Sequence, residues 1–333
     1  MNLLERLNLP LLDEHLGRVE AALAQAVRSD DPFLSEVAGH LITAGGKRLR
    51  PVLVIASAAA SGAQSDGGIF QDVIQGAASV ELVHLGSMYH DDVIDGADSR
   101  RGVPSVNAVW GNLVAIVAGD FLLARASEIA ASLGTEVSGL LAATIGRLCE
   151  GEVAELQYAY NPSRPESAYL TAITGKTASL MATSCRVGAL LAGADRAVIE
   201  TLTRFGEAFG IAFQIWDDVL DLVGTDHGLG KPAGHDLVEG VYTLPVIRAL
   251  AVPSVGAELH SLLGGRLDTP TRDKARDIIR STDALLASVV EARRFADQAE
   301  ATLSGLPNEP VVDSLRGLGH RLLDQLDVSR LTA

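Results

Sequence analysis

Apolar positions along the chain recur mainly at intervals of three and four residues, the period of an amphipathic helix. The first clear series is Leu12, Leu16, Val19, Leu23 and Val27. Further helices are predicted at about 69–95, 113–133, 135–160, 167–191 and 195–223. Glycine or proline punctuates these segments at Gly96, at Asn161-Pro162 and across 224–234. Because no alternating strand pattern or Asn-Gly hairpin stands out, the predicted fold class is all-α.

Several of the predicted helices are long and apolar around much of their circumference, as in the segment 211–223. Helices of this kind are typical of the middle of a helix bundle, where they are covered on all sides. The Gly- and Pro-rich stretches between them are short, and the sequence contains no fixed-period repeat. We therefore expect residues 1–333 to form a single domain.

Composition and charge narrow the classes of function. The chain is 47% apolar and only 4% aromatic, and its formal net charge is −15. An acidic balance disfavours nucleic acid and anionic membrane surfaces as main partners, because both select basic proteins. The apolar stretch 113–126 is too short for a transmembrane segment and is interrupted by Asp120. With no signal-peptide pattern and no disulfide framework from Cys149 and Cys185, we expect a cytoplasmic protein.

Two aspartate clusters are the most informative residues, because both place acids at i, i+1 and i+4 within apolar helical sequence. Residues at i and i+4 share one face of a helix, about 40° apart, so their charges repel unless a cation neutralises them. Oxygen-only ligands favour magnesium over zinc. The sequence therefore predicts magnesium sites at Asp91, Asp92 and Asp95 and at Asp217, Asp218 and Asp221.

Two other interpretations of these clusters have less support. Each cluster alone could be a solvated acidic face, but two copies of one spacing in apolar surroundings disfavour this. The pair His90-Asp91 could indicate a metal phosphohydrolase. The remaining histidines show no arrangement that completes such a site.

A basic segment near the N-terminus reads Gly45-Gly46-Lys47-Arg48-Leu49-Arg50-Pro51. Glycines allow a sharp turn, and closely spaced Lys and Arg form a clamp for a diphosphate. Lys47 and Arg50 are the expected clamp, whereas Arg48 is expected to be a solvated surface charge. Further cations follow at Arg100, Arg101, Lys176 and Lys231.

Several motifs in order along the chain together resemble the trans-polyprenyl diphosphate synthase family. They are GGKRLRP, ELVHLGSMYHDDVIDGADSRRG, WGNLVAIVAGDFLLA, GKTASL, FQIWDDVLD and GKPAGHDLVEGVYTLP, between residues 45 and 245. The resemblance implies an isoprenoid-synthase fold, a bundle of long, mostly antiparallel helices around a central cavity. It also implies a magnesium-dependent prenyltransferase that adds isopentenyl diphosphate to an allylic diphosphate, and a homodimer.

The resemblance assigns roles residue by residue. The diphosphate of isopentenyl diphosphate would be held by Lys47, Arg50, His84 and Arg101. Two to three magnesium ions on the six aspartates would bridge to the allylic diphosphate. That diphosphate would also be bound by Arg100, Lys176 and Lys231, with Thr177 and Gln214 at its reactive end. One departure is Val241, which stands where the family commonly has Lys. It puts the strength of allylic diphosphate binding in question, not the reaction class.

Product length is expected to depend on residues one to two helical turns before Asp91. Here they are Val83, Gly86 and Ser87, whose side chains are all small or of modest size. In the family, the resemblance implies, bulky aromatic side chains at these positions block further elongation of the product. Their absence predicts an all-trans product longer than farnesyl diphosphate, used for a quinone side chain, with farnesyl or geranylgeranyl diphosphate as the alternative. Met88, Tyr89 or Phe121 could block the tunnel instead.

Two competing functions come from the same motifs. A terpene cyclase shares one aspartate-rich motif but needs no isopentenyl clamp, so GGKRLR argues against it. A non-catalytic subunit of a heteromeric synthase would be expected to lack aspartates, and this chain keeps all six. Val241 is the feature that favours such a subunit.

Overall fold

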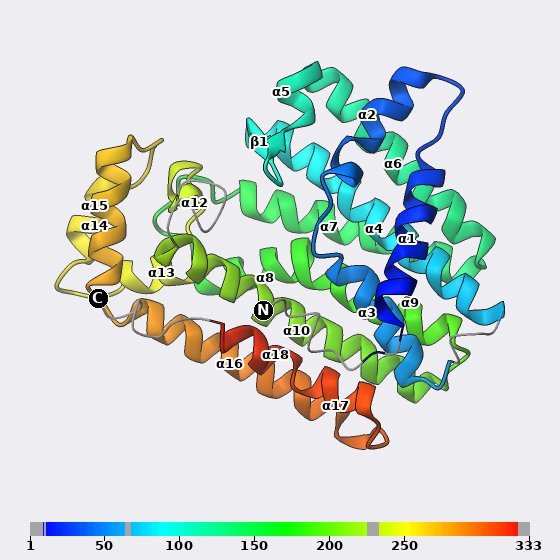
Figure 1. Ribbon diagram of the computed structural model, residues 1–333. Coiled ribbons are helices and arrows are strands. Elements are labelled where there is room, and N and C mark those ends of the chain that lie inside the picture. The colour runs from blue at the N-terminus through cyan, green and yellow to red at the C-terminus, as the bar shows by residue number, and fades with distance from the viewer. Residues whose placement is uncertain (1–8, 10, 64–67, 225–232, 326–333) are drawn as a thin grey trace. The chain divides into compact units, whose positions relative to one another are not determined.

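The computed structural model (Figure 1) describes residue 9 and the ranges 11–63, 68–224 and 233–325. The chain forms two compact units, each described by itself below. The first unit comprises 1–146, 180–206 and 302–315, and the second comprises 147–179, 207–301 and 316–333. Among the described residues, five helices contribute residues to both units, namely α7 (Thr135–Leu156), α9 (Ser179–Leu191), α10 (Arg196–Val223), α16 (Ala284–Thr302) and α17 (Pro310–Arg316).

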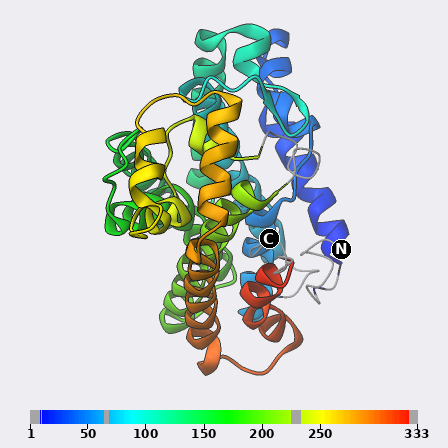
Figure 2. The same cartoon turned by 90° about the vertical axis from the view of Figure 1, so that its left-hand side faces the viewer.

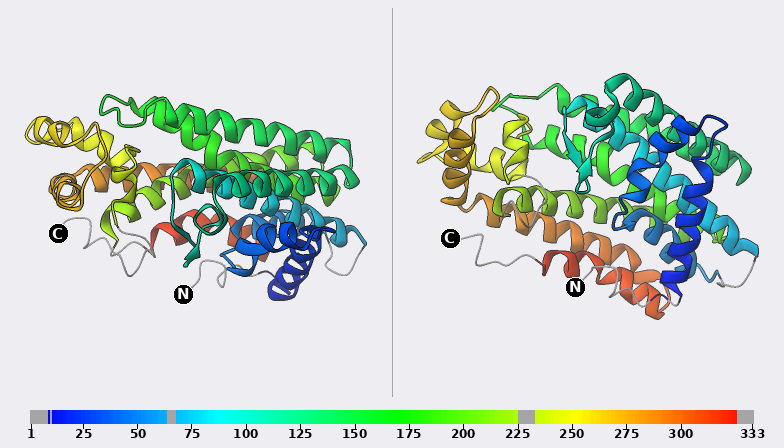
Figure 3. Two further views of the ribbon diagram at one scale, coloured as in Figure 1. Left: turned by 90° about the horizontal axis from the view of Figure 1, so that it is seen from above. Right: turned by 45° about the horizontal axis from the view of Figure 1, so that its top comes forward.

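The first unit is built around the helix α4 (Gly68–Ile94), which agrees closely with the helix predicted at 69–95. Its other elements up to α7 are α1 (Leu12–Ala26), α2 (Pro32–Thr43), α3 (Leu49–Ala60), α5 (Val106–Trp110) and α6 (Asn112–Ser132). α4 packs on α6, α1 and α3, and seen from above it lies between α6 and the other two (Figure 3). A helix covered on several sides must be apolar around its circumference, as the sequence of this segment is.

A pair of glycines brings α4 and α6 into close contact. A Cβ atom added at Gly86 would lie 3.0 Å from the carbonyl oxygen of Gly119, and one at Gly119 would lie 2.4 Å from Nε2 of His90. A larger residue at Gly86 would press on the backbone of α6, and one at Gly119 would displace the ring of His90. The length of α4 is also set by glycine, because Gly96, with φ of 62°, follows the last helical residue Ile94.

A short hairpin follows α4 and was not predicted. Its strands, β1 (Ser99–Arg100) and β2 (Val103–Pro104), pair antiparallel with Ser99 opposite Pro104. The two turn residues, Arg101 and Gly102, both have positive φ, as a tight two-residue hairpin loop requires. Strands of two residues are too short to show an alternating pattern in the sequence.

The second unit contains the short helices that follow α10 and the long helix α16 (Ala284–Thr302). The remaining helices of this unit are α8 (Glu166–Ile173), α12 (His235–Val238), α13 (Leu244–Leu250), α14 (Gly256–Leu262), α15 (Thr269–Arg280) and α18 (Leu318–Leu323). α13, α14 and α15 pack on one another (Figure 2). Asp268 caps α15 by accepting a hydrogen bond from the backbone nitrogen of Thr271 at 3.0 Å.

The helix predicted at 167–191 is interrupted by one turn of π-helix, η2 (Thr174–Ala178), between α8 and α9. Gly175 lies against Gly151 of α7 so closely that a Cβ atom on Gly175 would be 2.8 Å from the Cα of Gly151. The turn places Lys176 and Thr177, two predicted site residues. Single π-turns inside helices are frequent at functional sites.

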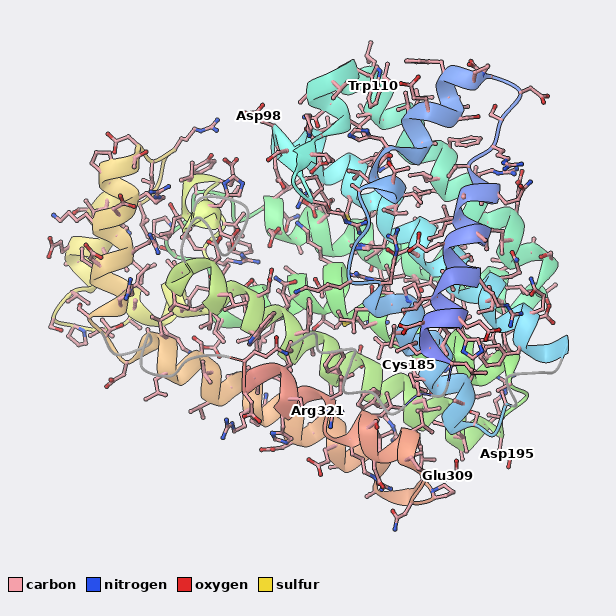
Figure 4. All side chains as sticks on the ribbon, in the orientation of Figure 1. Asp98, Trp110, Cys185, Asp195, Glu309 and Arg321 are labelled. Atoms are coloured by element: carbon pink, nitrogen blue, oxygen red, sulfur yellow. The ribbon has the colours of Figure 1, made fainter. Side chains whose placement is uncertain are left out.

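The two cysteines form no disulfide: Cys149 is exposed, and Cys185, labelled in Figure 4, is buried in the first unit. No helix in the part of the chain that the structure describes is both long enough and apolar enough to cross a membrane. The predicted all-α class is confirmed, since the hairpin is the sole strand pair among the described residues. The prediction of a single domain stays a prediction.

Candidate diphosphate and metal sites

The first aspartate cluster lies at the C-terminal end of α4. Asp91 and Asp92 are in the last turn, and Asp95 follows the helix directly. The backbone nitrogen of Asp95 donates to the carbonyl oxygen of Asp91 at 2.8 Å, so the helical i, i+4 relation is kept. Asp91 and Asp95 are partly exposed, whereas Asp92 is 0% exposed. The three acids therefore differ in their access to a ligand.

Asp92 is held by an arginine from the hairpin. Nε of Arg100 donates to its Oδ1 at 2.6 Å, and Nη2 lies at the same distance from that oxygen. Oδ2 of Asp92 is buried and has no hydrogen-bond partner among the described residues. Burial raises the pKa of this carboxyl, and the charge of Arg100 opposes that rise. Arg100, predicted to bind the allylic diphosphate, thus already pairs with Asp92.

Three of the predicted isopentenyl-side residues gather in the first unit near Glu81, which is 1% exposed. Burial lowers the pKa of Arg50 to about 10, while Glu81 counteracts this, so the guanidinium stays charged at neutral pH. Burial, followed by the charges of Arg50 and Arg101, lowers the pKa of His84 well below its usual value. A charged Arg50 beside a neutral His84 is a suitable arrangement for binding phosphate oxygens.

Nε of Arg50 is buried without a hydrogen-bond partner in the described part of the chain. Buried donors are normally paired, so an orphaned arginine N–H at a predicted binding position is notable. A phosphate oxygen would satisfy it. Lys47, the other clamp residue, is exposed in the loop between α2 and α3.

Arg101 holds the loop between α2 and α3 by hydrogen bonds to its backbone. Its Nη1 donates to the carbonyl oxygen of Leu41 at 3.2 Å and also to that of Gly45. A Cβ atom on Gly46 would lie 2.9 Å from the guanidinium carbon of Arg101, so glycine is needed there. Nη2 of Arg101 lies 3.8 Å from Oε1 of Glu81. Arg101 is therefore engaged with the protein itself as well as placed beside the predicted site.

The prediction that Arg48 is a solvated surface charge is wrong. Arg48 is 5% exposed, and its guanidinium pairs with Glu20 at 2.5 Å and Glu81 at 2.9 Å. These acids lie 28 and 33 residues away in the sequence. The charge pattern of GGKRLRP alone could not reveal partners on other helices.

The second aspartate cluster lies near the C-terminal end of α10, in the second unit. Asp217 is exposed, whereas Asp218 and Asp221 are 4% and 3% exposed. Both oxygens of Asp218 accept hydrogen bonds from uncharged groups: Tyr169 Oη at 2.5 Å and Gln214 Nε2 at 2.8 Å. Burial raises the pKa of Asp218 well above its usual value, and the neighbouring Asp236 raises it further.

The other predicted residues of the second unit connect to this cluster. Thr177 Oγ1 donates to Gln214 Oε1 at 2.7 Å, which extends the chain of hydrogen bonds to Asp218. Lys176 Nζ lies 2.7 Å from a carboxylate oxygen of Glu152 and 2.7 Å from one of Glu155. Lys231 lies outside the described residues.

Val241 follows Gly240, whose φ is 74° and against which the ring of Tyr160 packs. The backbone nitrogen of Val241 donates to the carbonyl oxygen of Asp236 at 2.8 Å. Asp236 in turn donates its backbone N–H to Oδ2 of Asp221 at 3.3 Å. The segment with the unusual valine is therefore tied by its backbone to the second aspartate cluster.

These donors fit magnesium. Within 11–63, 68–224 and 233–325, no three His, Cys, Asp or Glu side chains converge on a ready-made ion site. Magnesium usually takes only one or two protein carboxylates and completes its shell with water and substrate phosphate. Partly exposed Asp91 and Asp95 and exposed Asp217 offer such oxygens, and the buried, unpartnered Oδ2 of Asp92 adds to the negative field.

The model of the polyprenyl synthetase family matches residues 31–280. The chain belongs to this family. Component 2 of the heptaprenyl diphosphate synthase of Geobacillus stearothermophilus is 42% identical over 308 residues, covering 92% of this chain and 94% of that protein. The nonaprenyl diphosphate synthase of Mycobacterium tuberculosis is 37% identical over 297 residues, covering 89% and 88%.

A crystal structure of a polyprenyl synthase from Caulobacter crescentus, complexed with calcium and isoprenyl diphosphate, superimposes with a TM-score of 0.89. It shares 34% sequence identity and covers 96% of this chain and 97% of that one. The resemblance read from the motifs is thereby confirmed at the level of family and fold.

Within this polyprenyl synthetase, the predicted chain-length residues all lie on α4. Val83 is fully buried and Ser87 is half-buried. Gly86 faces α6, since a Cβ atom there would lie 3.1 Å from the side chain of Leu123 as well as close to Gly119. The missing side chain at Gly86 is thus explained by helix packing. Its role in product length stays a prediction.

The three alternative blocking residues lie in different surroundings. Tyr89 is fully buried, and its hydroxyl donates to the carbonyl oxygen of Val37 at 2.8 Å, so it is directed toward α2. Met88 is 8% exposed and its sulfur lies 3.6 Å from Nη2 of Arg101. Phe121 is half-buried on α6.

Proposed function

We propose that this polyprenyl synthetase is a magnesium-dependent prenyltransferase that condenses isopentenyl diphosphate with an allylic diphosphate. The observation that carries the proposal is the orphaned, buried Nε of Arg50, beside neutral His84, in the same unit as Asp91 and Asp95. An unsatisfied cation donor in the same unit as a carboxylate cluster suits a substrate that binds both protein cations and metal through phosphate.

The isopentenyl diphosphate would bind to the loop and helices of the first unit. Its diphosphate would be held by Lys47, Arg50, His84 and Arg101. Arg50 supplies its unpartnered N–H, and His84 supplies a neutral ring nitrogen. Arg101 holds the loop that carries Lys47, so it contributes through this loop and through its charge.

The allylic diphosphate would bind with Arg100, Lys176, Thr177, Gln214 and Lys231. Arg100 is paired with Asp92 and Lys176 with two glutamates, so both cations are held in defined places. Thr177 and Gln214 orient the buried Asp218 by hydrogen bonds. Lys231 is assigned from the sequence alone.

Two to three magnesium ions would be bound by the clusters Asp91, Asp92 and Asp95 and Asp217, Asp218 and Asp221. The exposed or partly exposed members, Asp91, Asp95 and Asp217, are the best placed to offer oxygens directly. Asp92 and Asp218 are buried and hydrogen-bonded, which fixes the helix ends that carry the others. Bound magnesium would neutralise charge on the leaving diphosphate.

In the reaction, the allylic carbon–oxygen bond breaks and the isopentenyl double bond attacks the allylic carbon, forming a carbon–carbon bond. The proton lost from the isopentenyl unit passes to the departing diphosphate. Fixed cations such as Lys176 and Arg100 stabilise the charge that develops on the leaving group. The clamp of Arg50 and Lys47 holds the second substrate in position for the attack.

The product is expected to be an all-trans polyprenyl diphosphate longer than farnesyl. Relatives that make heptaprenyl and nonaprenyl diphosphate support this expectation, as does the lack of an aromatic residue at Val83, Gly86 and Ser87. Geranylgeranyl or farnesyl diphosphate is the alternative product. A role in quinone side-chain synthesis and a cytoplasmic location stay predictions.

A second candidate function is that of one component in a heteromeric synthase. The Geobacillus relative is named component 2, and Val241 removes one expected cation. An exposed apolar stripe on α5 and α6 could bind either a second copy, as the predicted homodimer requires, or another subunit. It is formed by Val109, Leu113, Ile116 and Val117, which are 47%, 81%, 40% and 61% exposed.

The test is elongation by the purified protein with labelled isopentenyl diphosphate, magnesium and, in turn, dimethylallyl, geranyl, farnesyl and geranylgeranyl diphosphate. Magnesium-dependent products that vanish in an Asp91→Ala, Asp217→Ala double variant support the proposal, and their length identifies the product class. No elongation with any primer, followed by activity on adding a partner protein, would establish the component of a heteromeric synthase instead.

A further inference from the structure

Arg48 occupies a strained backbone conformation at the start of α3. Its φ and ψ are 47° and 35°, the left-handed region that residues other than glycine rarely adopt. Such a conformation persists only where surrounding contacts determine it, and it clusters at functional sites. The contacts of the Arg48 side chain therefore explain why the loop turns at this point.

The guanidinium of Arg48 ties three helices together. Its Nε and Nη2 donate to the two carboxylate oxygens of Glu20, on α1, at 2.5 and 3.1 Å. Nη1 donates to Glu81, on α4, at 2.9 Å, and Nη2 also donates to the carbonyl oxygen of Ile42, on α2, at 3.1 Å. These four hydrogen bonds use all three nitrogens of the guanidinium, whereas lysine has three donors on a single nitrogen and cannot make the whole set.

These contacts leave Arg48 no role as a direct substrate ligand. It is 5% exposed, and its four hydrogen bonds all go to protein oxygens. Breaking a buried ion pair by removing one partner is strongly destabilising, because a buried charge is left uncompensated. Arg48 is thus fixed inside the protein while its neighbour Lys47 is exposed.

The loop that carries the clamp is held at both ends by arginines that share one acid. Arg101 donates to the carbonyl oxygens of Leu41 and Gly45 at the beginning of the loop, and Arg48 holds its end. Both guanidinium groups lie beside Glu81, at 3.8 and 2.9 Å. Lys47 directly precedes Arg48 and Arg50 lies two residues after it, so the backbone positions of both depend on that of Arg48.

We propose that Arg48, anchored by Glu81 and Glu20, is a positioning residue that holds Lys47 and Arg50 in place for the diphosphate of isopentenyl diphosphate. This inference rests on the proposed function and adds to it a residue that touches no substrate. A clamp that is already ordered loses less conformational freedom on binding, so preorganisation appears as affinity for this one substrate. The allylic substrate, bound by other residues, is not affected.

The experiment compares Arg48→Lys, Arg48→Met and Glu20→Gln with Arg186→Met. Arg186 belongs to the first unit, and its Nη1 lies 2.7 Å from Oε1 of Glu200. Neither residue is part of the clamp, so Arg186→Met controls for the loss of an ion pair. KM for isopentenyl diphosphate and for the allylic primer is measured separately, with kcat. Binding of isopentenyl diphosphate alone is measured by calorimetry.

We expect KM for isopentenyl diphosphate to rise about tenfold in Arg48→Met, which corresponds to about 1.4 kcal/mol of binding free energy. Arg48→Lys and Glu20→Gln should show smaller rises in the same parameter. KM for the primer should stay within about twofold, and Arg186→Met should resemble the wild type in both. Calorimetry should show the same order of affinities.

Two results would overturn the inference while leaving the proposed function intact. One is an unchanged KM for isopentenyl diphosphate in folded Arg48→Lys and Glu20→Gln variants of an active enzyme. The other is an equal rise of both KM values, which indicates a merely structural role. If Arg48→Met does not fold, the KM values of Arg48→Lys and Glu20→Gln decide whether the inference holds. A wild-type protein that neither elongates nor binds isopentenyl diphosphate overturns the proposed function itself, and this inference with it.

Discussion

The two aspartate clusters have the same spacing but differ in how the protein compensates their buried charge. In the first unit, buried Asp92 is paired with a cation, Arg100. In the second unit, buried Asp218 accepts hydrogen bonds from the uncharged groups of Tyr169 and Gln214. Burial raises the pKa of both carboxyls, and nearby acids add to the rise in each case, but only at Asp92 does an arginine, Arg100, feature among the main opposing causes.

This difference shows that one sequence pattern can be stabilised in two physical ways. A buried carboxylate beside arginine keeps its charge in the absence of any ligand. A carboxylate held by a phenol and an amide gains orientation without charge neutralisation. Arg164 also interacts with the charge of Asp218, but among the described residues it forms no ion pair with that carboxyl as Arg100 does with Asp92. We therefore infer that the second cluster depends more than the first on bound cations.

The strongest test of the comparison removes one exposed acid from each cluster. Asp91→Ala and Asp217→Ala should each lower kcat about 10²–10³-fold, as removal of a group that stabilises transition-state charge commonly does. Steady-state elongation at saturating substrates measures the loss. Asp98→Ala, an exposed acid close to the first cluster, is the matched control and should leave kcat unchanged. Full activity in either cluster variant would remove that cluster from the proposed site.

The second test breaks the two kinds of compensation. Arg100→Met leaves Asp92 buried without its cation and should lower the free energy of unfolding by about 3 kcal/mol. Tyr169→Phe removes one hydrogen bond to Asp218 and should cost about 1.5 kcal/mol. Urea unfolding of the magnesium-free protein measures both losses. Equal losses would contradict the view that charge compensation differs between the clusters.

Such contrasts explain what the sequence could and could not predict. The helix α4 and the i, i+4 spacing of Asp91 and Asp95 are local, so the apolar period was sufficient to predict them. The hydrogen-bond partners of Asp92 and Asp218 differ in how far away they lie in the sequence. Arg100 lies eight residues from Asp92, in a motif that was identified, whereas Tyr169 lies 49 residues from Asp218.

Residues whose role depends on distant partners were missed for the same reason. Glu20 lies outside the motifs, and Glu81 begins one of them without a role that its motif could reveal. Their function depends on where α1 and α4 place them around Arg48. The π-turn η2 was missed because it lies within a continuous helical run, with α8 directly before it and α9 directly after it. Backbone contact between Gly151 and Gly175, which requires the tertiary structure, marks the turn.

A third test concerns the first unit and measures how the protonation of His84 affects stability. Its pKa is lowered by burial and by neighbouring arginines, so below the ordinary pKa of about 6.5 the unfolded chain binds a proton that the folded protein does not. Stability from this group is therefore present above pH 6.5 and is lost as pH falls, by at most about 1.4 kcal/mol per pH unit.

Replacing this histidine by an uncharged residue should remove that dependence. When the pH is lowered from 7.5 to 5.5, the wild type should lose stability through His84 and the His84→Gln variant should not. The decrease in the free energy of unfolding should therefore be about 1 kcal/mol smaller in His84→Gln than in the wild type. Denaturant unfolding across this range measures it. His15, whose pKa is also lowered, is present in both proteins and cancels in the difference. Parallel pH curves would show that the pKa of His84 is the same in the folded and unfolded protein, contrary to this prediction.

The smallest expected effect concerns the second unit, where Val241 stands in the segment tied to Asp221. If this cluster relies on cations brought to it, Val241→Lys should strengthen binding of the allylic diphosphate by about 0.5–1 kcal/mol, or a few-fold in KM. KM for the primer measures it, with KM for isopentenyl diphosphate expected to stay constant. Val290→Lys, at a 61% exposed position of α16, adds the same charge elsewhere in the unit and should change neither. An unchanged or weaker affinity for the primer in Val241→Lys would show that the second cluster gains nothing from a further cation.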